Sequence, residues 1–185
     1  DARVLTTGTI RLVSPLIPRY FAVFLNLDLN LFEDVKIREA LSRAIDKERV
    51  IREIFDGQAD VISSPIVPGL PGALAVENLY NPQKAKELLD AASWKDSNND
   101  GIRDKKLDRK AKNPTKFEFD LLFPDRPELR QVVEIIRENL ASIGISLTPR
   151  PLSIGEFATS LQARSYRAIL FGEVITTGQN PDLFP

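Results

Sequence analysis

The sequence of 185 residues contains no cysteine and no histidine. The first absence excludes disulfides and thiolate chemistry, and the second excludes histidine-ligated metals and every catalytic mechanism that uses an imidazole base. Most common hydrolase mechanisms are therefore excluded. The absence of cysteine is compatible with both an oxidising and a reducing compartment, so it leaves the location of the protein open.

A strong net charge and a long apolar run are also missing. The 25 basic and 26 acidic residues leave a net charge of -1, which gives no overall field to attract nucleic acid or anionic lipid. No window approaches about 18 consecutive apolar residues, and the first residues, DARVLTTGTIRL, lack the regions of a signal peptide. We expect neither a nucleic-acid partner nor direct insertion into a membrane.

The chain does contain enough apolar residues for a core, since 43% of them are hydrophobic. It contains no methionine, and it ends on NPDLFP without a charged or helical terminus. We therefore expect an internal piece, cut from a longer precursor, that folds as one domain or lobe.

The first half of the chain predicts two strands followed by two helices. Runs rich in β-branched and aromatic residues predict strands over 3–13 and 20–29. Asp34 and Asp46 are suitable N-cap residues, and the apolar spacing after them predicts helices, the second ending at Phe55. The proline-rich stretch that follows predicts an ordered, extended loop, either a surface connector or the wall of a cleft.

The second half alternates helices with strands. Apolar periodicity and capping signals predict helices over 81–93, 127–143 and 153–163, strands over 117–123, 145–152 and 166–171, and a hairpin-like stretch over 105–116. Such alternation predicts parallel βαβ crossovers with helices packed on a sheet. The predicted fold class is α/β, with a mixed, mainly parallel sheet flanked by helices.

Three motifs occur in an order that is typical of one family. They are DVKIREALSRAIDKERVIREIFDGQA (34–59), YNPQKAKELLDAASWKDSNNDG (80–101) and ENLASIGISLTPRPLSIGEFATSLQARSYRAILFG (138–172). With these motifs the chain resembles the bacterial extracellular solute-binding proteins of family 5. These proteins are the oligopeptide-, dipeptide- and nickel-binding receptors of ABC importers.

The resemblance implies a lobe of the periplasmic-binding-protein type (type II). Residues 1–185 would form a single lobe, domain III, of a larger two-lobe receptor, and residues 1–20 would enter it near the hinge. A peptide or similar small solute would lie between this lobe and an N-terminal lobe, and an ABC permease would be the further partner. The resemblance also implies a non-catalytic protein in the periplasm or outside the cell, membrane-anchored if the parent is a lipoprotein.

The resemblance places the ligand contacts in the stretch GEVITTGQNPDLF. Family members hold the peptide α-amine there with an acidic side chain, but Thr176 or Thr177 occupies its place in this sequence and Asn180 replaces a second aspartate. An ammonium group removed from water needs a carboxylate or several acceptors, so Glu173 is a candidate substitute. Together with Asp182, these residues are the candidate ligand contacts. The alternative is that Glu173 is a surface carboxylate and that the others are turn residues.

An acidic stretch after the third expected helix resembles a calcium-binding loop. The residues at alternate positions of an EF-hand-like pattern are Asp96, Asn98, Asp100, Ile102 and Asp104. Leu107 stands where the bidentate glutamate of such a loop belongs. Calcium binding and a structural turn with Asx hydrogen bonds are both open interpretations, and we expect no other cofactor.

Three further residues have alternative interpretations. Arg19 and Tyr20, at the start of the second expected strand, either face the hinge and cleft or are simply exposed. Trp94, the only tryptophan, either stacks on a ligand ring or packs at the end of a helix, and we expect packing.

Two other functions are compatible with the composition. A carboxylate-based hydrolase needs no histidine, and a calcium-stabilised extracellular interaction module needs only the acidic loop. Neither explains the three motifs, so we expect a transport receptor lobe.

Overall fold

The computed structural model describes residues 19–64, 79–107, 110 and 112–174. In chain order the elements are β1 (Arg19–Leu25), α1 (Val35–Ala44), α2 (Lys47–Ile54), α3 (Pro82–Ala91), β2 (Asp104–Lys105), β3 (Thr115–Lys116), β4 (Glu118–Pro124), α4 (Pro127–Ala141), β5 (Ser146–Leu152), α5 (Ile154–Gln162) and β6 (Ala168–Val174). The expected helices and strands are present in this order, while the strand expected over 3–13 lies outside the described residues.

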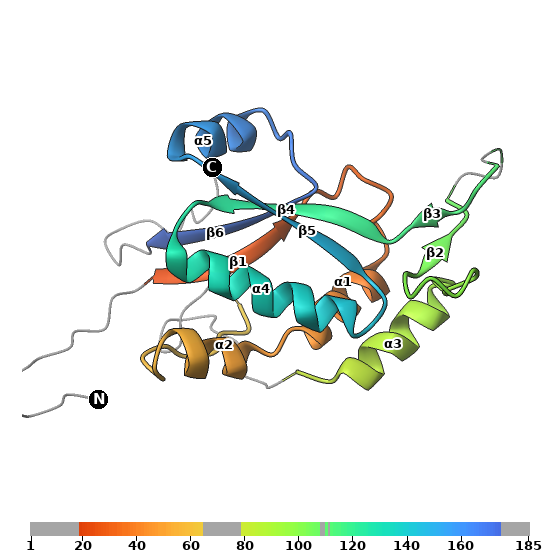
Figure 1. Ribbon diagram of the computed structural model, residues 1–185, viewed down its shortest axis with the longest axis horizontal. Coiled ribbons are helices and arrows are strands. Elements are labelled where there is room, and N and C mark those ends of the chain that lie inside the picture. Colours follow the sequence, from red (N-terminus) through yellow and green to blue (C-terminus); the bar gives the residue numbers. More distant parts are fainter. Residues whose placement is uncertain (1–18, 65–78, 108–109, 111, 175–185) are drawn as a thin grey trace, which may run out of the picture.

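The main sheet contains four strands in the order β1-β6-β4-β5. Strand β4 pairs in parallel with β5 and with β6, whereas β1 pairs antiparallel with β6. The predicted mixed, mainly parallel sheet is therefore confirmed. The hairpin-like stretch is the separate pair β2 and β3, which lies away from the main sheet (Figure 1).

Side chains at the helix starts explain why the helices begin where they do. Asp34, Asp46, Asn81 and Ser153 each accept a hydrogen bond from a backbone N–H in the first turn of α1, α2, α3 and α5. At α5 this is the predicted capping box, since Glu156 also accepts from the backbone of Ser153. These boundaries depend on local contacts only.

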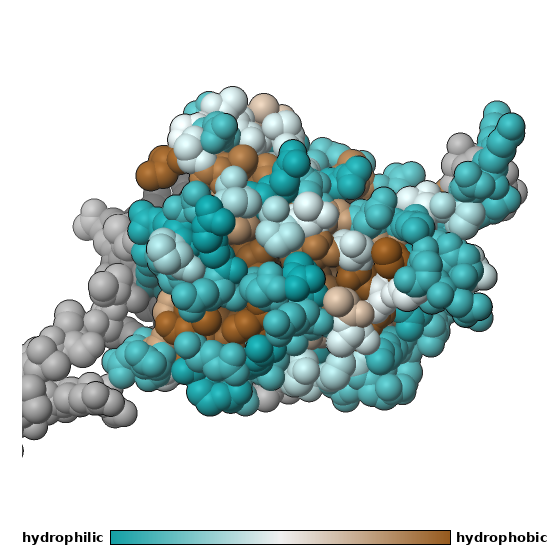
Figure 2. All heavy atoms as spheres, viewed as in Figure 1, coloured by the Kyte–Doolittle hydropathy of each residue, from teal (hydrophilic) through white to brown (hydrophobic). Residues whose placement is uncertain are grey.

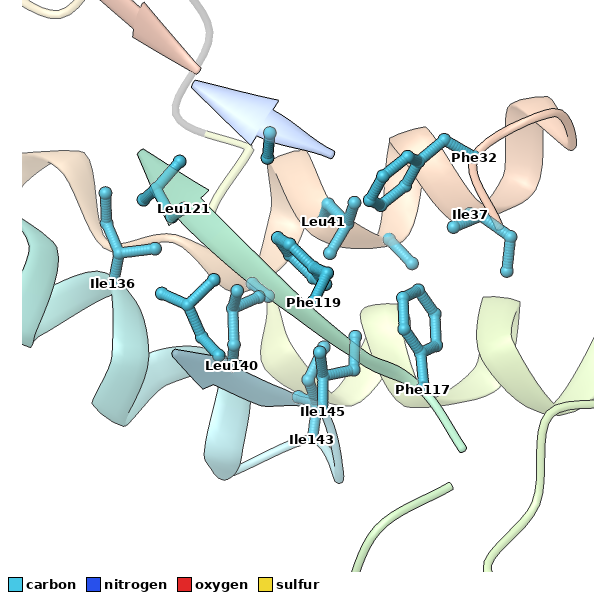
Figure 3. Packing of buried hydrophobic residues seen from close by; sticks show 14 of the residues in the cluster. Phe32, Ile37, Leu41, Phe117, Phe119, Leu121, Ile136, Leu140, Ile143 and Ile145 are labelled. Atoms are coloured by element: carbon cyan, nitrogen blue, oxygen red, sulfur yellow. The ribbon is translucent and has the colours of Figure 1, made fainter. Parts of the chain in front are cut away.

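Helices cover both faces of the sheet, but unequally. Alternate residues of β4 face opposite sides, so Phe119 and Leu121 join the large core with α1, α3 and α4, whereas Leu122 joins a small cluster with Phe157 of α5. Figure 1 shows α5 on the opposite side of the sheet from α1, α2 and α4. The large core is drawn in Figure 3, with β4 running between α1 and α4.

The strand expected over 20–29 is shorter than predicted. It ends at Leu25, opposite Ala168 where β6 begins, because no further strand residue is available for pairing. Asn26 then turns the chain: its backbone N–H donates to the carbonyl of Arg167, and its side chain accepts from the N–H of Asp28. Leu27 is 55% exposed, so the strand predicted over 20–29 was wrong beyond Leu25.

No helix in the part of the chain that the structure describes is long and apolar enough to cross a bilayer.

Candidate ligand-binding edge of the sheet

Three strands of the main sheet end at the same edge. The carboxyl ends of β4, β5 and β6 and the amino end of β1 lie at the left of the sheet in Figure 1. In open α/β sheets, ligands bind outside the carboxyl ends of the parallel strands. This edge is therefore the candidate ligand-binding site, and it is called the carboxyl edge below.

The predicted ligand residues lie at the end of β6 or directly after it. Glu173 lies in β6 opposite Tyr20, and Val174 pairs with Arg19. The strand is longer than the expected 166–171, because β1 provides a partner as far as Val174. Thr176, Thr177, Asn180 and Asp182 lie outside the described residues, so their contact with a ligand stays a prediction.

Arg19 and Tyr20 differ from each other in exposure. Tyr20 is only 4% exposed, so its side chain is buried. The expectation that this residue is simply exposed was therefore wrong. Arg19 is exposed, and its guanidinium lies over the ring of Phe21, 4.4 Å from the ring centroid. This cation–π contact holds a positive charge at the carboxyl edge.

Phe21 lies across Gly172 on the neighbouring strand. A Cβ atom built at Gly172 would be 2.5 Å from Cε1 of the Phe21 ring, which is closer than carbon atoms approach. The Phe21 ring also stacks with Phe55 at the end of α2, with centroids 6.4 Å apart. Sequence reasoning missed the contact between Phe21 and Gly172, and the only signal was a glycine directly after the strand predicted over 166–171.

A carboxylate that forms an ion pair lies directly after the end of β4. Asp125 accepts two hydrogen bonds from Arg130, at 2.6 and 2.8 Å, and its backbone N–H donates to the carbonyl of Leu152 at the end of β5. The bonds from Arg130 lower the pKa of Asp125. This carboxylate is already satisfied within the lobe and fixes the end of β4 relative to α4.

A glycosidase-type mechanism needs one carboxylic acid with a raised pKa beside an ionised partner. Hydrogen bonds from neighbouring groups instead lower the pKa of four described carboxyl groups: Asp100, Asp125, Glu134 and Glu156. These four groups are therefore not candidates for the acid of such a mechanism.

The acidic stretch 96–104 forms a turn that is held by its own side chains. The carboxylate of Asp96 accepts from the backbone N–H groups of Asp100 and Gly101, at 3.1 and 2.9 Å. Asp100 accepts from the N–H of Ile102, and its other oxygen lies 2.6 Å from the ammonium of Lys116. The bond from Ile102 is an Asx-turn bond, as in the structural interpretation, and the other contacts hold the same turn.

The last candidate calcium ligand belongs to a different set of contacts. Asp104 is 6% exposed, and both of its carboxylate oxygens accept from the hydroxyl of Ser97 at 2.7 Å. Within the described ranges, no group of three or more acidic side chains is arranged to hold a metal ion. Calcium binding by this loop stays a prediction.

Trp94 packs in the core, as expected. It is 1% exposed, and its ring lies 4.5 Å from that of Phe117, centroid to centroid. The guanidinium of Arg103 donates to the Trp94 carbonyl, at 2.6 Å. A ligand-stacking role for this ring is therefore wrong.

Comparison with known proteins shows the family of the chain. Residues 4–185 match the family described as "Bacterial extracellular solute-binding proteins, family 5 Middle". The chain belongs to this family. The resemblance that the three motifs carry is thereby confirmed.

Relatives within family 5 include receptors with different named ligands. The oligopeptide-binding protein AppA of Bacillus subtilis is 34% identical over 145 residues, covering 76% of this chain and 25% of that protein. The nickel-binding periplasmic protein of Escherichia coli is 30% identical over 133 residues, covering 71% and 24%. The chain thus spans about a quarter of the length of these relatives.

A solved family structure has the same fold. The structure of AppA from Bacillus subtilis in complex with a nonapeptide superposes with a TM-score of 0.80 and 28% identity. The match covers 91% of this chain and 33% of that one. Family 5 proteins are solute-binding proteins.

Proposed function

We propose that this chain is the solute-capturing lobe, of the domain III type, of an ABC-importer receptor for oligopeptides or similar solutes. The observation that supports this most is the carboxyl edge of a family 5 sheet, where β4, β5 and β6 end beside the exposed Arg19. A ligand would lie between this edge and an N-terminal lobe, and a hinge motion would close the two lobes around it.

The ligand class is inferred from relatives and from the edge itself. AppA, the relative with a nonapeptide in its structure, is an oligopeptide-binding protein. The candidate contacts are Glu173, Thr176, Thr177, Asn180 and Asp182, which follow or end β6. A peptide α-amine needs a negative or strongly accepting partner. Glu173 would therefore take the role of the acidic side chain that other family members have at the position of Thr176 or Thr177.

The proposal includes a membrane partner and a location for the receptor. The receptor would deliver its solute to an ABC permease, and it would work in the periplasm or outside the cell, on a lipid anchor if the parent is a lipoprotein. It would act without a cofactor and without catalysis. The near-zero net charge supports the expectation that nucleic acid is not a partner.

Calorimetric titration against a peptide pool tests the proposal. The protein is compared in two forms, this chain alone and a form extended to the full length of its relatives. We expect saturable binding by the extended form and weak or undetectable binding by the chain alone, because half of the contact surface is missing from it.

Glu173→Gln in the extended form provides the matched test of the ammonium contact. It removes one negative charge without changing the shape of the side chain, so peptide affinity should fall, whereas Asp60→Asn at an exposed position should leave it unchanged. Equal binding by the chain alone and by the extended form would contradict the two-lobe receptor.

A further inference from the structure

An elongated cavity of about 460 Å³ lies between the sheet and helices α1, α2 and α4. Its lining runs along β1 from Tyr20 to Leu25 and along α4 from Leu129 to Leu140. Each of these stretches is about 16 Å long, from about 3.3 Å per strand residue and 1.5 Å per helix residue. Dividing the volume by this length gives a mean cross-section of roughly 30 Å², which is wide enough for one alkyl chain.

The walls of the cavity are mostly apolar. The lining residues from α4 and from the sheet include Leu121, Leu129, Val132, Ile136, Leu140, Leu147 and Leu170. Figure 3 shows Leu121 of β4 with Ile136 and Leu140 of α4 projecting into the space between these elements. Hydrophobic residues are also visible at the surface between α4 and α2 in Figure 2. Such walls favour an alkyl chain over a polar one.

Polar groups gather at one end of the cavity. The ammonium of Lys47 lines it and donates to the carbonyl of Ile62, at 3.4 Å. The N–H of Asp46 donates to the side chain of Asn139, which places this end beside the last turn of α4. Ser42 lines the cavity as well. The opposite end lies beside Phe21 and so beside the carboxyl edge.

The charge of the lining is positive. Its described residues include Lys47 and Arg38 but no Asp or Glu, and Lys47 forms no ion pair with any described residue. Arg38 is already engaged, because it donates to the carbonyls of Phe32 and Glu33. Burial lowers the pKa of Lys47, since its ammonium has lost water without gaining an anion. An anionic group beside Lys47 would restore the lost solvation.

We propose that this cavity binds a linear apolar carboxylate of the fatty-acid class, with its alkyl chain along α4 and its carboxylate beside the Lys47 ammonium. All of the walls that the structure describes come from this chain. We therefore expect binding without a second lobe, with the carboxylate at the Lys47 end of the cavity, away from the carboxyl edge.

Titration of the 185-residue chain with sodium decanoate, followed by calorimetry, tests the proposal. One decanoate should bind per chain, and Lys47→Gln should weaken the affinity about tenfold or more, because a charge-assisted hydrogen bond is lost. Lys36→Gln, at an exposed position of α1, is the matched control and should bind like the wild type. Decan-1-ol, which lacks the charge, should bind the wild type and Lys47→Gln equally.

A second variant tests the position of the alkyl chain. Val50 of α2 lines the cavity and is only partly buried, so Val50→Phe narrows the cavity while leaving the buried core in place. If this variant keeps its helical circular dichroism, it should lose decanoate binding. The proposal is overturned if the folded wild type shows no saturable binding, or if Lys47→Gln binds decanoate as the wild type does.

Discussion

Gly172 lies under the ring of Phe21, and this contact joins β1 and β6 at the carboxyl edge. The two residues are paired in the sheet but far apart in the sequence. A glycine in a strand weakens it unless another group needs the space. Here the ring of Phe21 fills the space of the missing side chain, carries the guanidinium of Arg19 on one face and stacks on Phe55.

Gly172→Ala should therefore destabilise the lobe. Its Cβ would meet the ring of Phe21 at 2.5 Å, so the ring or the strand must move. Overpacking of this kind costs about 1–3 kcal/mol. Urea unfolding followed by the fluorescence of the buried Trp94 measures the change in free energy of unfolding.

Gly155→Ala is the matched control for this substitution. Gly155 lies in α5, and a Cβ atom there would meet nothing within 4 Å. Since alanine is the better helix former, this variant should be unchanged or more stable by up to about 1 kcal/mol. Equal loss of stability in both variants would contradict the role of the Phe21 contact.

Asp125 and Arg130 make the stability of the lobe depend on pH. Hydrogen bonds from Arg130 lower the pKa of Asp125 in the folded state, so the pair stabilises the fold above the ordinary carboxyl pKa of about 3.9. The contribution is lost as the pH falls through the lowered folded-state pKa. Asp125→Asn should therefore melt below the wild type near neutral pH, and the two melting temperatures should converge in acid.

Thermal melts of both proteins from about pH 7 to below about pH 4 measure this convergence. Asp60→Asn serves as the control, because Asp60 is exposed and forms no ion pair within the described ranges. Its melting temperature should follow that of the wild type at every pH. A constant gap between Asp125→Asn and the wild type would show that the pair is not the cause.

At the scale of elements, locally determined features were predicted best. The starts of α1, α2, α3 and α5 depend on side chains that bond within the first turn, so the sequence alone was sufficient. The ends of β1 and β6 were wrong, because pairing with a distant strand decides them. The contact between Phe21 and Gly172 was missed because the two residues are far apart in the sequence. The cavity beside Lys47 was missed because residues from all four strands of the main sheet and from α1, α2 and α4 line it.

The turn over 96–104 is an element whose role can be tested directly. Asp96 accepts two backbone hydrogen bonds there, so Asp96→Ala should lower the free energy of unfolding by about 1–2 kcal/mol. If the turn is structural, the wild type should melt at the same temperature in millimolar calcium and in chelator. The difference between the two proteins should likewise be independent of calcium.

Calcium binding would give a different result in the same melts. A cation that binds only the folded protein raises its melting temperature with increasing concentration. Stabilisation of the wild type by calcium, without stabilisation of Asp96→Ala, would contradict the structural interpretation of the turn.

At the scale of the whole molecule, the topology brings three strand ends of a family 5 sheet to one edge. The chain covers about a quarter of its curated relatives, and its sheet presents the carboxyl ends of β4, β5 and β6 beside one another. The family motifs were sufficient to predict the family and the fold class from sequence. The ligand contacts were not predictable to the same degree, because the sequence departs from the family pattern at Thr176 and Thr177.

Hydrogen–deuterium exchange of the form extended to both lobes, with and without a saturating peptide pool, tests the central claim most directly. We predict slower exchange on peptide addition at the carboxyl edge, in segments 19–22, 123–126 and 171–174. The turn over 96–104 and helix α3 should exchange as before, since they lie away from this edge. Protection of that turn and helix, with no change at the carboxyl edge, would contradict the account.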